Sequence, residues 1–274
     1  MGQRDELLAH LRHPTAFFPR DVRTLGRTTL AVLVLVPGIV LAAIAVLVLG
    51  ALGAPRRWID ACYAGYARLG TLVGATPLHV TGMRHAVPGT AYVVVANHES
   101  DWDPIVVFAA LSHLSMRAVI KREMMRLPIV GAALRASGNV CVDRDATGAD
   151  AARVTAVMEE RPPDVSMLFY AEGTRARDGA LHPFKKGAFT TAIRYGMPIL
   201  PVATAGTFRV WPPNTLRVRG YPITVEIGEP ISTTGLDAAD REALLTRCHD
   251  VVRGLRLRAR DRLRALGVDP GGLD

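Results

Sequence analysis

The strongest constraint on this chain is one long uncharged segment near its N-terminus. Residues 28–55 contain no Asp, Glu, Lys or Arg, and Arg27 and Arg56 bracket them. At about 1.5 Å per residue, a helix of this length reaches about 40 Å, more than the ~30 Å hydrocarbon core of a bilayer. A secretory signal is the alternative, although its apolar part usually has only about 7–15 residues. The sequence therefore predicts an N-terminal anchor, residues 1–55, followed by a folded domain, residues 56–274.

Two forms of this anchor remain open. Pro37 and Gly38 interrupt the segment, and a proline inside a helix removes one backbone donor and favours a kink or break. The anchor is then either one kinked spanning helix or a re-entrant pair of short helices. Basic residues flank both ends, so the positive-inside bias does not choose an orientation. Residues 1–27 predict an amphipathic surface helix or a disordered tail.

Charge and cysteine content narrow the class of protein. Lys and Arg number 33 against 25 Asp and Glu, a net charge of +8. A basic protein at a membrane suits anionic lipids, and the sequence contains no recognisable nucleic-acid module, so we expect no nucleic-acid partner. Cys62, Cys141 and Cys248 form no disulfide or zinc pattern, which fits a reducing compartment.

Beyond the anchor, strand and helix signals alternate. The expected strands are short, mostly apolar runs at residues 91–96, 116–120, 139–142, 165–171 and 198–204, and segments with alternating polarity at residues 216–219 and 223–227. The expected helices are residues 58–72, 104–111, 123–135, 149–160, 187–195 and 240–266. Strands this apolar are usually covered on both faces, so the pattern predicts an α/β fold, a mixed sheet flanked by helices. The last helix is rich in arginine and could contact anionic headgroups or simply present a solvated face.

A polar cluster follows the first of these strands directly. His98 lies between the strand end and a helix start marked by Asp103 and Pro104. Open α/β sheets generally bind ligands at the carboxyl ends of their strands. His98 could therefore act as a general base, with Asp103 holding its other ring nitrogen. The alternatives are an ordinary loop histidine with a helix cap, or a metal site that includes Asp101.

Three further clusters at strand ends suit anions. Residues 172–175 follow a strand, and their glycine permits close backbone approach while Arg175 offers a planar fork for phosphate. Lys185 and Lys186 precede a helix start, where backbone amides favour anions. Arg144 lies at another strand end. The first two clusters could instead be solvated turns, and Arg144 could simply pair with Asp143. Phosphate-loop, dinucleotide-binding and nucleophile-elbow motifs are missing from the sequence.

Together these motifs resemble the 1-acylglycerol-3-phosphate (lysophosphatidate) acyltransferase family over about residues 97–202. The blocks that carry the resemblance are His98 with Asp103, Lys121 with residues 138–144, Glu172-Gly173-Thr174-Arg175, residues 183–189 and residues 198–202. The sequence departs from the family at Ala171, where proline is common. All three lysines of the chain fall inside these blocks.

The resemblance implies a glycerolipid acyltransferase-like fold and a function. A fatty acyl group would pass directly from acyl-CoA or acyl carrier protein to the free hydroxyl of 1-acylglycerol 3-phosphate, giving phosphatidate, without a cofactor or metal. His98 and Asp103 would be catalytic. The substrate-binding residues would be Lys121, Arg144, Glu172, Gly173, Thr174, Arg175, Lys185 and Lys186. The expected partners are membrane lipids, the lysophospholipid and the thioester donor.

The same resemblance predicts a location and leaves alternatives. We expect the chain to be anchored at the cytoplasmic face of the cell membrane, where its lipid substrate and product reside. The acceptor could be another lysolipid or glycolipid, for example a lyso-ornithine lipid. A non-catalytic lipid-binding protein and a metal-dependent hydrolase are the alternatives from other classes.

Overall fold

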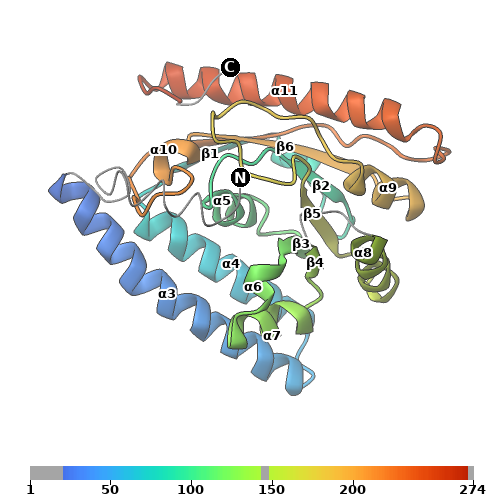
Figure 1. Ribbon diagram of the computed structural model, residues 1–274, viewed down its shortest axis with the longest axis horizontal. Coiled ribbons are helices and arrows are strands. Elements are labelled where there is room, and N and C mark those ends of the chain that lie inside the picture. Colours follow the sequence, from blue (N-terminus) through green and yellow to red (C-terminus); the bar gives the residue numbers. More distant parts are fainter. Residues whose placement is uncertain (1–20, 143–147, 271–274) are drawn as a thin grey trace.

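The computed structural model describes residues 21–142 and 148–270 and contains one mixed sheet (Figure 1). Its strands are β1 (Leu78–Thr81), β2 (Val93–Ala96), β3 (Met116–Lys121), β4 (Val140–Val142), β5 (Ser166–Tyr170), β6 (Ile199–Ala205) and β7 (Ile223–Ile227). They pair in the order β1-β7-β6-β2-β5-β3-β4. All pairs are parallel except β6 with β7. The predicted α/β class is therefore confirmed.

Helices cover both faces of this sheet. They are α3 (Val22–Ala51), α4 (Arg56–Val73), α5 (Asp103–Ala110), α6 (Arg122–Met125), α7 (Pro128–Ala136), α8 (Gly148–Glu160), α9 (Gly187–Arg194), α10 (Thr207–Val210) and α11 (Arg241–Ala265), with a 3-10 turn at Met83–His85. Strand residues alternate between the faces. In β2, Val94 and Ala96 pack in a core with residues of α3, α4 and α5, while Val93 and Val95 pack with α9 and α11.

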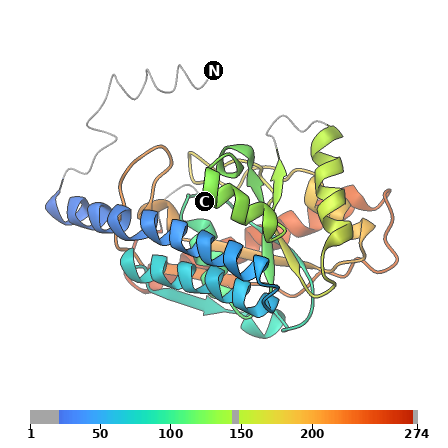
Figure 2. The ribbon, with the colours of Figure 1, turned by 90° about the horizontal axis from the view of Figure 1, so that it is seen from below.

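The apolar N-terminal segment forms one continuous helix. Helix α3 continues through Pro37, and α4 returns alongside it (Figures 1 and 2). At Gly38 an added Cβ would lie 3.5 Å from the Leu69 side chain, which shows how closely the two helices approach. The segment is therefore one continuous helix and not a pair of short helices. The amphipathic segment expected from residues 1–27 falls mostly on residues 1–20, which lie outside the described part of the chain.

Helix α3 is long and apolar enough to cross a bilayer by length and composition. Only 17% of its most apolar window is buried within the protein. Its inward side is not free, because Ala31 and Leu35 belong to the main core and Ala43 and Val46 pack against α7. The helix therefore presents an exposed apolar stripe while its other side is fixed to the domain.

Three local expectations need correction. The helix expected at residues 123–135 is divided into α6 and α7, because Pro128 cannot continue α6 and instead occupies the first turn of α7. The strand expected at residues 216–219 does not form: the Val218 amide donates to Thr28 Oγ1, and the Arg219 amide donates to the Val210 carbonyl. Strand β1, which the sequence did not predict, pairs with β7.

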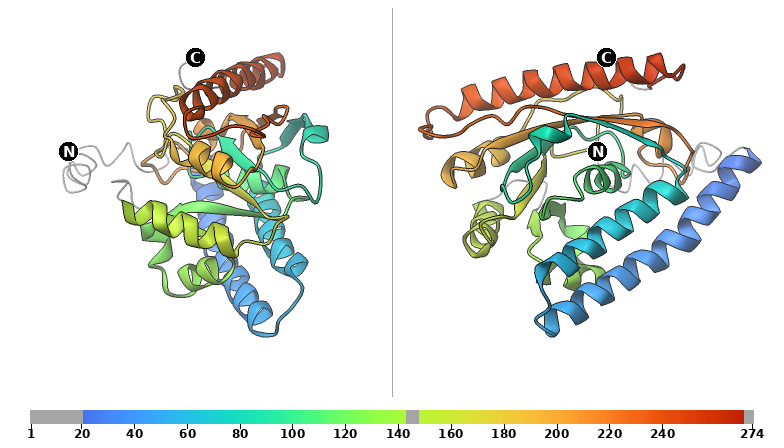
Figure 3. Two further views of the ribbon diagram at one scale, coloured as in Figure 1. Left: turned by 90° about the vertical axis from the view of Figure 1, so that its right-hand side faces the viewer. Right: turned by 180° about the vertical axis from the view of Figure 1, so that it is seen from behind.

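Helix α11 lies on the opposite side of the sheet from α3 and α4 (Figures 1 and 3). Two of its arginines, Arg256 and Arg260, are each only 3% exposed. The expectation that these two contact headgroups is therefore wrong, since their side chains point into the protein. Arg253 is exposed and pairs with Asp250 on the outer face of the same helix.

Candidate active site

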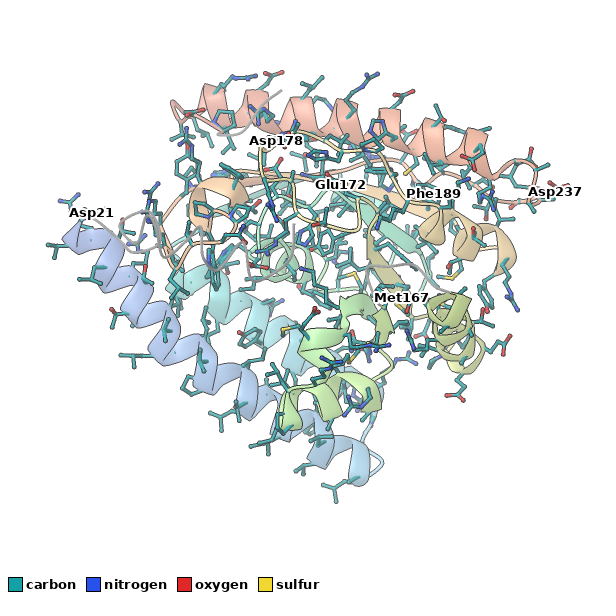
Figure 4. The ribbon with its side chains drawn as sticks, viewed as in Figure 1. Asp21, Met167, Glu172, Asp178, Phe189 and Asp237 are labelled. Atoms are coloured by element: carbon teal, nitrogen blue, oxygen red, sulfur yellow. The ribbon has the colours of Figure 1, made fainter. Side chains whose placement is uncertain are left out.

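The candidate site lies where the central strands end. Strand β2 pairs with β5 on one side and β6 on the other, and His98 follows it within two residues. Glu172 occupies the equivalent place after β5, because Ala96 and Tyr170 are register partners. Figure 4 places Glu172 and Asp178 on the loop after β5, near α11. The parallel pairing thus brings two of the predicted clusters to one edge, although 74 positions separate them in the chain.

His98 and Asp103 form a hydrogen-bonded pair. Nδ1 of His98 lies 2.8 Å from Oδ2 of Asp103, whose side chain is fully buried. The same oxygen accepts from the backbone amides of Glu99 at 2.7 Å and Ser100 at 2.8 Å. Asp103 also begins α5, where the helix dipole favours a carboxylate. The expectation that Asp103 caps the helix is wrong: Trp102 is the N-cap residue and makes no side-chain cap hydrogen bond. Asp103 instead accepts from loop amides that precede α5 and orients His98.

The imidazole of His98 is held on a second side by an aromatic ring. Tyr170 stacks on it with centroids 4.1 Å apart and planes inclined by 19°. Burial, with a smaller contribution from the Asp103 charge, raises the pKa of the Tyr170 phenol well above its usual value, so the phenol stays neutral. The tyrosine hydroxyl is buried and has no hydrogen-bond partner among the described residues. Sequence reasoning missed Tyr170, and its place at the end of an apolar strand was the available signal.

Glu172 links the two loops through their backbones. Its Oε1 accepts from the His98 amide at 2.7 Å and its Oε2 from the His182 amide at 3.0 Å. The Ala176 amide donates back to the His98 carbonyl at 2.8 Å. Burial raises the pKa of the Glu172 carboxyl to about 7, and the two amide hydrogen bonds oppose this shift. The observed hydrogen bonds of Glu172 therefore hold the backbone of the two loops and position His98.

Glycine is favoured in this loop by its backbone conformation, which lies in the left-handed region. Gly173 has φ +72°, and a Cβ there would lie 2.7 Å from Cε of Lys185. The Lys185 side chain thus crosses directly over the Gly173 backbone, and its own amide donates to the Ala171 carbonyl at 2.7 Å. Thr174 is exposed, and Arg175 forms an ion pair with Asp101. Lys185 and Arg175 therefore both lie on the loop after β5, next to the His98 loop.

The remaining predicted binding residues lie elsewhere or outside the described residues. Lys186 pairs with Glu242 at the start of α11, with 2.9 Å between Nζ and Oε1. Lys121 ends β3, which is separated from β2 by β5. Arg144 lies outside the described residues. Of the two adjacent lysines, only Lys185 therefore lies over the loop that carries Arg175.

Two buried residues beside His98 were not singled out by the sequence. Asn97 bridges to β6, accepting from the Thr204 amide at 2.8 Å and donating to its carbonyl at 3.0 Å. Glu99 is 2% exposed and accepts from Nε of Arg256 at 2.8 Å. Burial raises the pKa of the Glu99 carboxyl to about 7, although Arg256 opposes the shift. The partner lies 157 positions along the chain, so no local pattern could have revealed the pair.

The metal-site alternative gains no support from the geometry. Among residues 21–142 and 148–270, no group of three or more His, Cys, Asp or Glu side chains could hold an ion. A cleft of about 380 Å³ lies between α4 and residues 112–115, but no residue of the His98 site lines it. It adjoins the start of β3, whereas His98 follows the end of β2, so the two lie at opposite edges of the sheet.

Comparison with known proteins confirms the resemblance seen in the motifs. Residues 77–205 match the model of the Acyltransferase family. The chain is 32% identical over 181 residues to a 1-acyl-sn-glycerol-3-phosphate acyltransferase of Limnanthes douglasii. It is 33% identical over 163 residues to 1-acyl-sn-glycerol-3-phosphate acyltransferase beta of Homo sapiens. These alignments cover 65% and 59% of this chain, and the chain spans 63% and 58% of the relatives' lengths.

A solved structure confirms the fold. The crystal structure of the 1-acyl-sn-glycerophosphate (LPA) acyltransferase from Thermotoga maritima superposes with a TM-score of 0.75. The match covers 90% of this chain and 98% of that one, at 23% sequence identity. The coverage extends beyond residues 77–205, so the likeness includes elements outside that segment as well as the sheet.

Proposed function

From a segment that matches the Acyltransferase family and carries a hydrogen-bonded His–Asp pair at the end of a central strand, we propose that this chain is a 1-acylglycerol-3-phosphate acyltransferase. It moves a fatty acyl group from a thioester, acyl-CoA or acyl carrier protein, to the free hydroxyl of the lysophospholipid and forms phosphatidate. The observation that carries the proposal is the 2.8 Å contact of His98 Nδ1 with Asp103 Oδ2. A protein that only bound lipid would have no need for a base oriented in this way.

The geometry supports a general-base mechanism. Asp103 occupies Nδ1 of His98, so Nε2 is the nitrogen that takes the proton from the acceptor hydroxyl. The oxygen attacks the thioester carbonyl carbon, the C–O ester bond forms and the C–S bond breaks. The proton on His98 then returns to the departing thiolate. No acyl-enzyme is needed, and buried Asp103 stabilises the imidazolium while it exists.

The acceptor phosphate has cationic partners on the loop after β5. Arg175 and Lys185 belong to this loop, and Gly173 lets the Lys185 chain pass against the backbone. Arg175 now pairs with half-exposed Asp101, so a phosphate would replace a solvent-accessible carboxylate of the same charge type. A planar guanidinium binds phosphate oxygens in pairs, which favours Arg175 as the primary contact.

The exposed stripe of α3 places the enzyme at its substrate. Its large apolar side chains at the surface are Val22, Leu25, Leu30, Val32, Leu33, Val36, Leu41, Ile44 and Val48. Soluble monomers rarely expose a contiguous apolar area of this extent, and insertion into lipid would remove it from water. We place the protein at the cytoplasmic face of the cell membrane, where acyl donors reside and its free cysteines fit a reducing compartment.

Thiol release from a long-chain acyl-CoA by the detergent-purified protein tests the proposal, with and without lysophosphatidate. Release should require the acceptor and fall by at least about 10²-fold in His98→Ala, since general-base catalysis typically contributes ~10²–10⁴-fold. The His182→Ala variant is the matched control, because its side chain pairs with Asp178 at the surface and the substitution keeps the backbone amide that donates to Glu172. Release without acceptor would indicate a thioesterase. Undiminished release in His98→Ala would exclude the proposed base.

A further inference from the structure

A buried arginine of helix α11 contacts residues of both loops of the candidate site. Helix α11 packs on β6, β7 and α9, and its Arg256 is only 3% exposed. Nε of Arg256 donates to Oε1 of Glu99 at 2.8 Å. Nη2 of the same guanidinium donates to the carbonyl of Gly179, in the loop after β5. One side chain thus joins α11 to both loops of the candidate site.

Glu99 connects this arginine to the His98–Asp103 pair. It follows His98 in the chain, and its amide is one of the two that donate to Oδ2 of Asp103. Its carboxylate is held by Arg256 and, at 3.3 Å, by Nδ2 of Asn97. Because the backbone and side chain of one residue move together, fixing the Glu99 carboxylate also fixes an amide that orients Asp103.

The second loop is tied to the same place. Gly179 lies between Glu172 and His182, whose contact closes the loop after β5. Glu172 holds this loop to the His98 amide, and Arg256 holds its far side through the Gly179 carbonyl. The two loops therefore share two independent clamps, one from a carboxylate in the loop and one from a helix beneath it.

Burying this ion pair is costly, which calls for an explanation other than stability. Desolvation raises the pKa of the Glu99 carboxyl to about 7 despite Arg256, with nearby Asp103 adding to the shift. Oε2 of Glu99 is buried and has no hydrogen-bond partner within the described residues. Buried ion pairs are often replaceable by apolar groups without loss of stability, so what such a pair can supply is a defined geometry.

We propose that Arg256 and Glu99 are positioning residues, which hold the His98 loop and the loop after β5 in the arrangement needed for acyl transfer. The inference rests on the proposed function. It assigns to α11 a part in catalysis that requires no contact with substrate. Arg256 acts on His98 through the Glu99 backbone and on Arg175 through the loop that carries Gly179.

Steady-state kinetics on the detergent-purified full chain test this assignment. In Arg256→Gln, kcat should fall by about 10- to 10²-fold, because small displacements of reacting groups cost this much. KM for acyl-CoA should stay within about twofold, because neither loop is assigned a contact with the donor, whereas KM for lysophosphatidate should rise because the loop that carries Arg175 loses one of its two holds. Arg256→Lys should recover part of kcat, because it keeps the charge but reaches only one partner at a time. Arg253→Gln, on the exposed face of α11, should match the wild type.

A double variant separates positioning from folding. Arg256→Gln alone leaves Glu99 buried without its counter-charge and should lower the unfolding temperature. Glu99→Gln/Arg256→Gln removes both charges, so its unfolding temperature should return toward that of the wild type while kcat stays low. If kcat and unfolding temperature recover together, the pair is only structural and the proposal is overturned.

Hydrogen exchange gives a readout that needs no activity. Exchange in Arg256→Gln should rise in peptides covering residues 97–103 and 172–182, but not in the strands β6 and β7 beneath α11. If the wild type shows no acyl transfer yet this local pattern appears, the proposed function fails and the positioning role stands. If the wild type is active and the variant matches it in kcat and exchange, the positioning role fails alone.

Discussion

At the scale of single residues, Arg175 carries the prediction about the acceptor. Arg175→Ala should raise KM for lysophosphatidate by about 10-fold or more, since a charge-assisted hydrogen bond contributes about 1.5–3 kcal/mol. kcat should change little if the phosphate contact is equally strong in the ground and transition states. The exposed Arg177, two residues along the same loop, provides the control as Arg177→Ala. Saturation kinetics with lysophosphatidate as the varied substrate measure the effect, and an unchanged KM would remove Arg175 from the acceptor site.

A second residue-scale prediction follows from the raised pKa of Glu172. Its carboxyl pKa moves from 4.5 to about 7 on folding, so between these pH values the folded chain binds more protons than the unfolded chain. The stability contribution of this group therefore falls as pH rises through that window, by at most about 1.4 kcal/mol per pH unit, and is constant above it. Glu172→Gln cannot titrate. The unfolding temperature of Glu172→Gln, measured relative to that of the wild type, should therefore rise from pH 5 to pH 7.

The matched control for this pH effect is Glu242→Gln. Glu242 is exposed, and its hydrogen bond with Lys186 lowers its carboxyl pKa, so it is ionised throughout the same window. Glu242→Gln should therefore shift the unfolding temperature by the same amount at pH 5, 6 and 7. If the difference in unfolding temperature between Glu172→Gln and the wild type is also the same at pH 5, 6 and 7, the raised pKa of Glu172 is contradicted, whatever the size of that difference.

Single-residue roles were only partly readable from the chain. His98, Asp103 and Arg175 carry recognisable chemistry at strand ends, so residue type and spacing predict their neighbourhood. Glu172 was expected to bind substrate, yet both its oxygens contact backbone amides. That outcome depends on the lateral pairing of β2 with β5, which joins residues far apart in sequence. Tyr170 and Glu99 were missed for the same reason, since their partners are distant and their own neighbours look ordinary.

At the scale of elements, the contact of α4 with the His98 loop predicts a steric effect. Gly74 ends α4, and a Cβ there would lie 2.3 Å from Cζ2 of fully buried Trp102. Gly74→Ala should destabilise the protein by about 1–3 kcal/mol, the usual cost of overpacking. It should also lower activity, because Trp102 immediately precedes Asp103. Thermal unfolding and thiol release measure the two effects.

The same helix supplies the control. Gly65 lies inside α4 with open space around its missing Cβ. Gly65→Ala should therefore stabilise the protein by about 0.5–1 kcal/mol, since alanine is favoured over glycine in a helix interior. Equal unfolding temperatures for the Gly74 and Gly65 variants would show that Trp102 can move aside and that α4 does not support the loop.

Most elements follow from local pattern, and the exceptions have local causes. Apolar runs predicted β2, β5 and β6, because strands buried on both faces read as nearly continuous apolar runs, and alternation predicted β7. Residues 216–219 alternate apolar and basic side chains but form no strand. The Val218 amide donates to the Thr28 hydroxyl of α3 and not to a neighbouring strand. Strand propensity cannot predict such a tertiary contact. The single helix α3 likewise tolerates Pro37. The helix has 30 residues, so the many backbone hydrogen bonds on either side of the proline offset the one that it removes.

At the scale of the whole molecule, layer order was the information the sequence lacked. The motifs predicted an α/β sheet but not that α3 and α11 lie on opposite faces of it (Figure 3). From the sequence, the apolar helix α3 and the arginine-rich helix α11 both looked suited to contact a membrane. Only the sheet order places α11 over β6 and β7 and turns Arg256 and Arg260 inward. The apolar stripe of α3 is therefore the surface expected to meet lipid.

Membrane association should thus depend on one face of the molecule. Leu33 and Leu41 of α3 are 68% and 66% exposed, so changing them leaves the core intact. In Leu33→Lys/Leu41→Lys, the fraction that floats with phosphatidylcholine–phosphatidylglycerol vesicles should fall. Affinity should drop at least about 10-fold, because burying one leucine in an apolar medium is worth about 1.5–3 kcal/mol and 1.4 kcal/mol is tenfold. The added positive charges would favour an anionic surface, so any loss reports the apolar contact.

Leu257→Lys on α11 is the matched control. It exchanges the same residue types at a 42% exposed position on the opposite face of the sheet. Flotation should be unchanged in this variant, and so should activity on lysophosphatidate supplied in detergent micelles for all three proteins. If Leu257→Lys lowers flotation as much as the α3 variant, the lipid-facing side has been assigned wrongly. If neither variant matters and high salt releases the wild type, headgroup charge and not the α3 stripe holds the protein at the membrane.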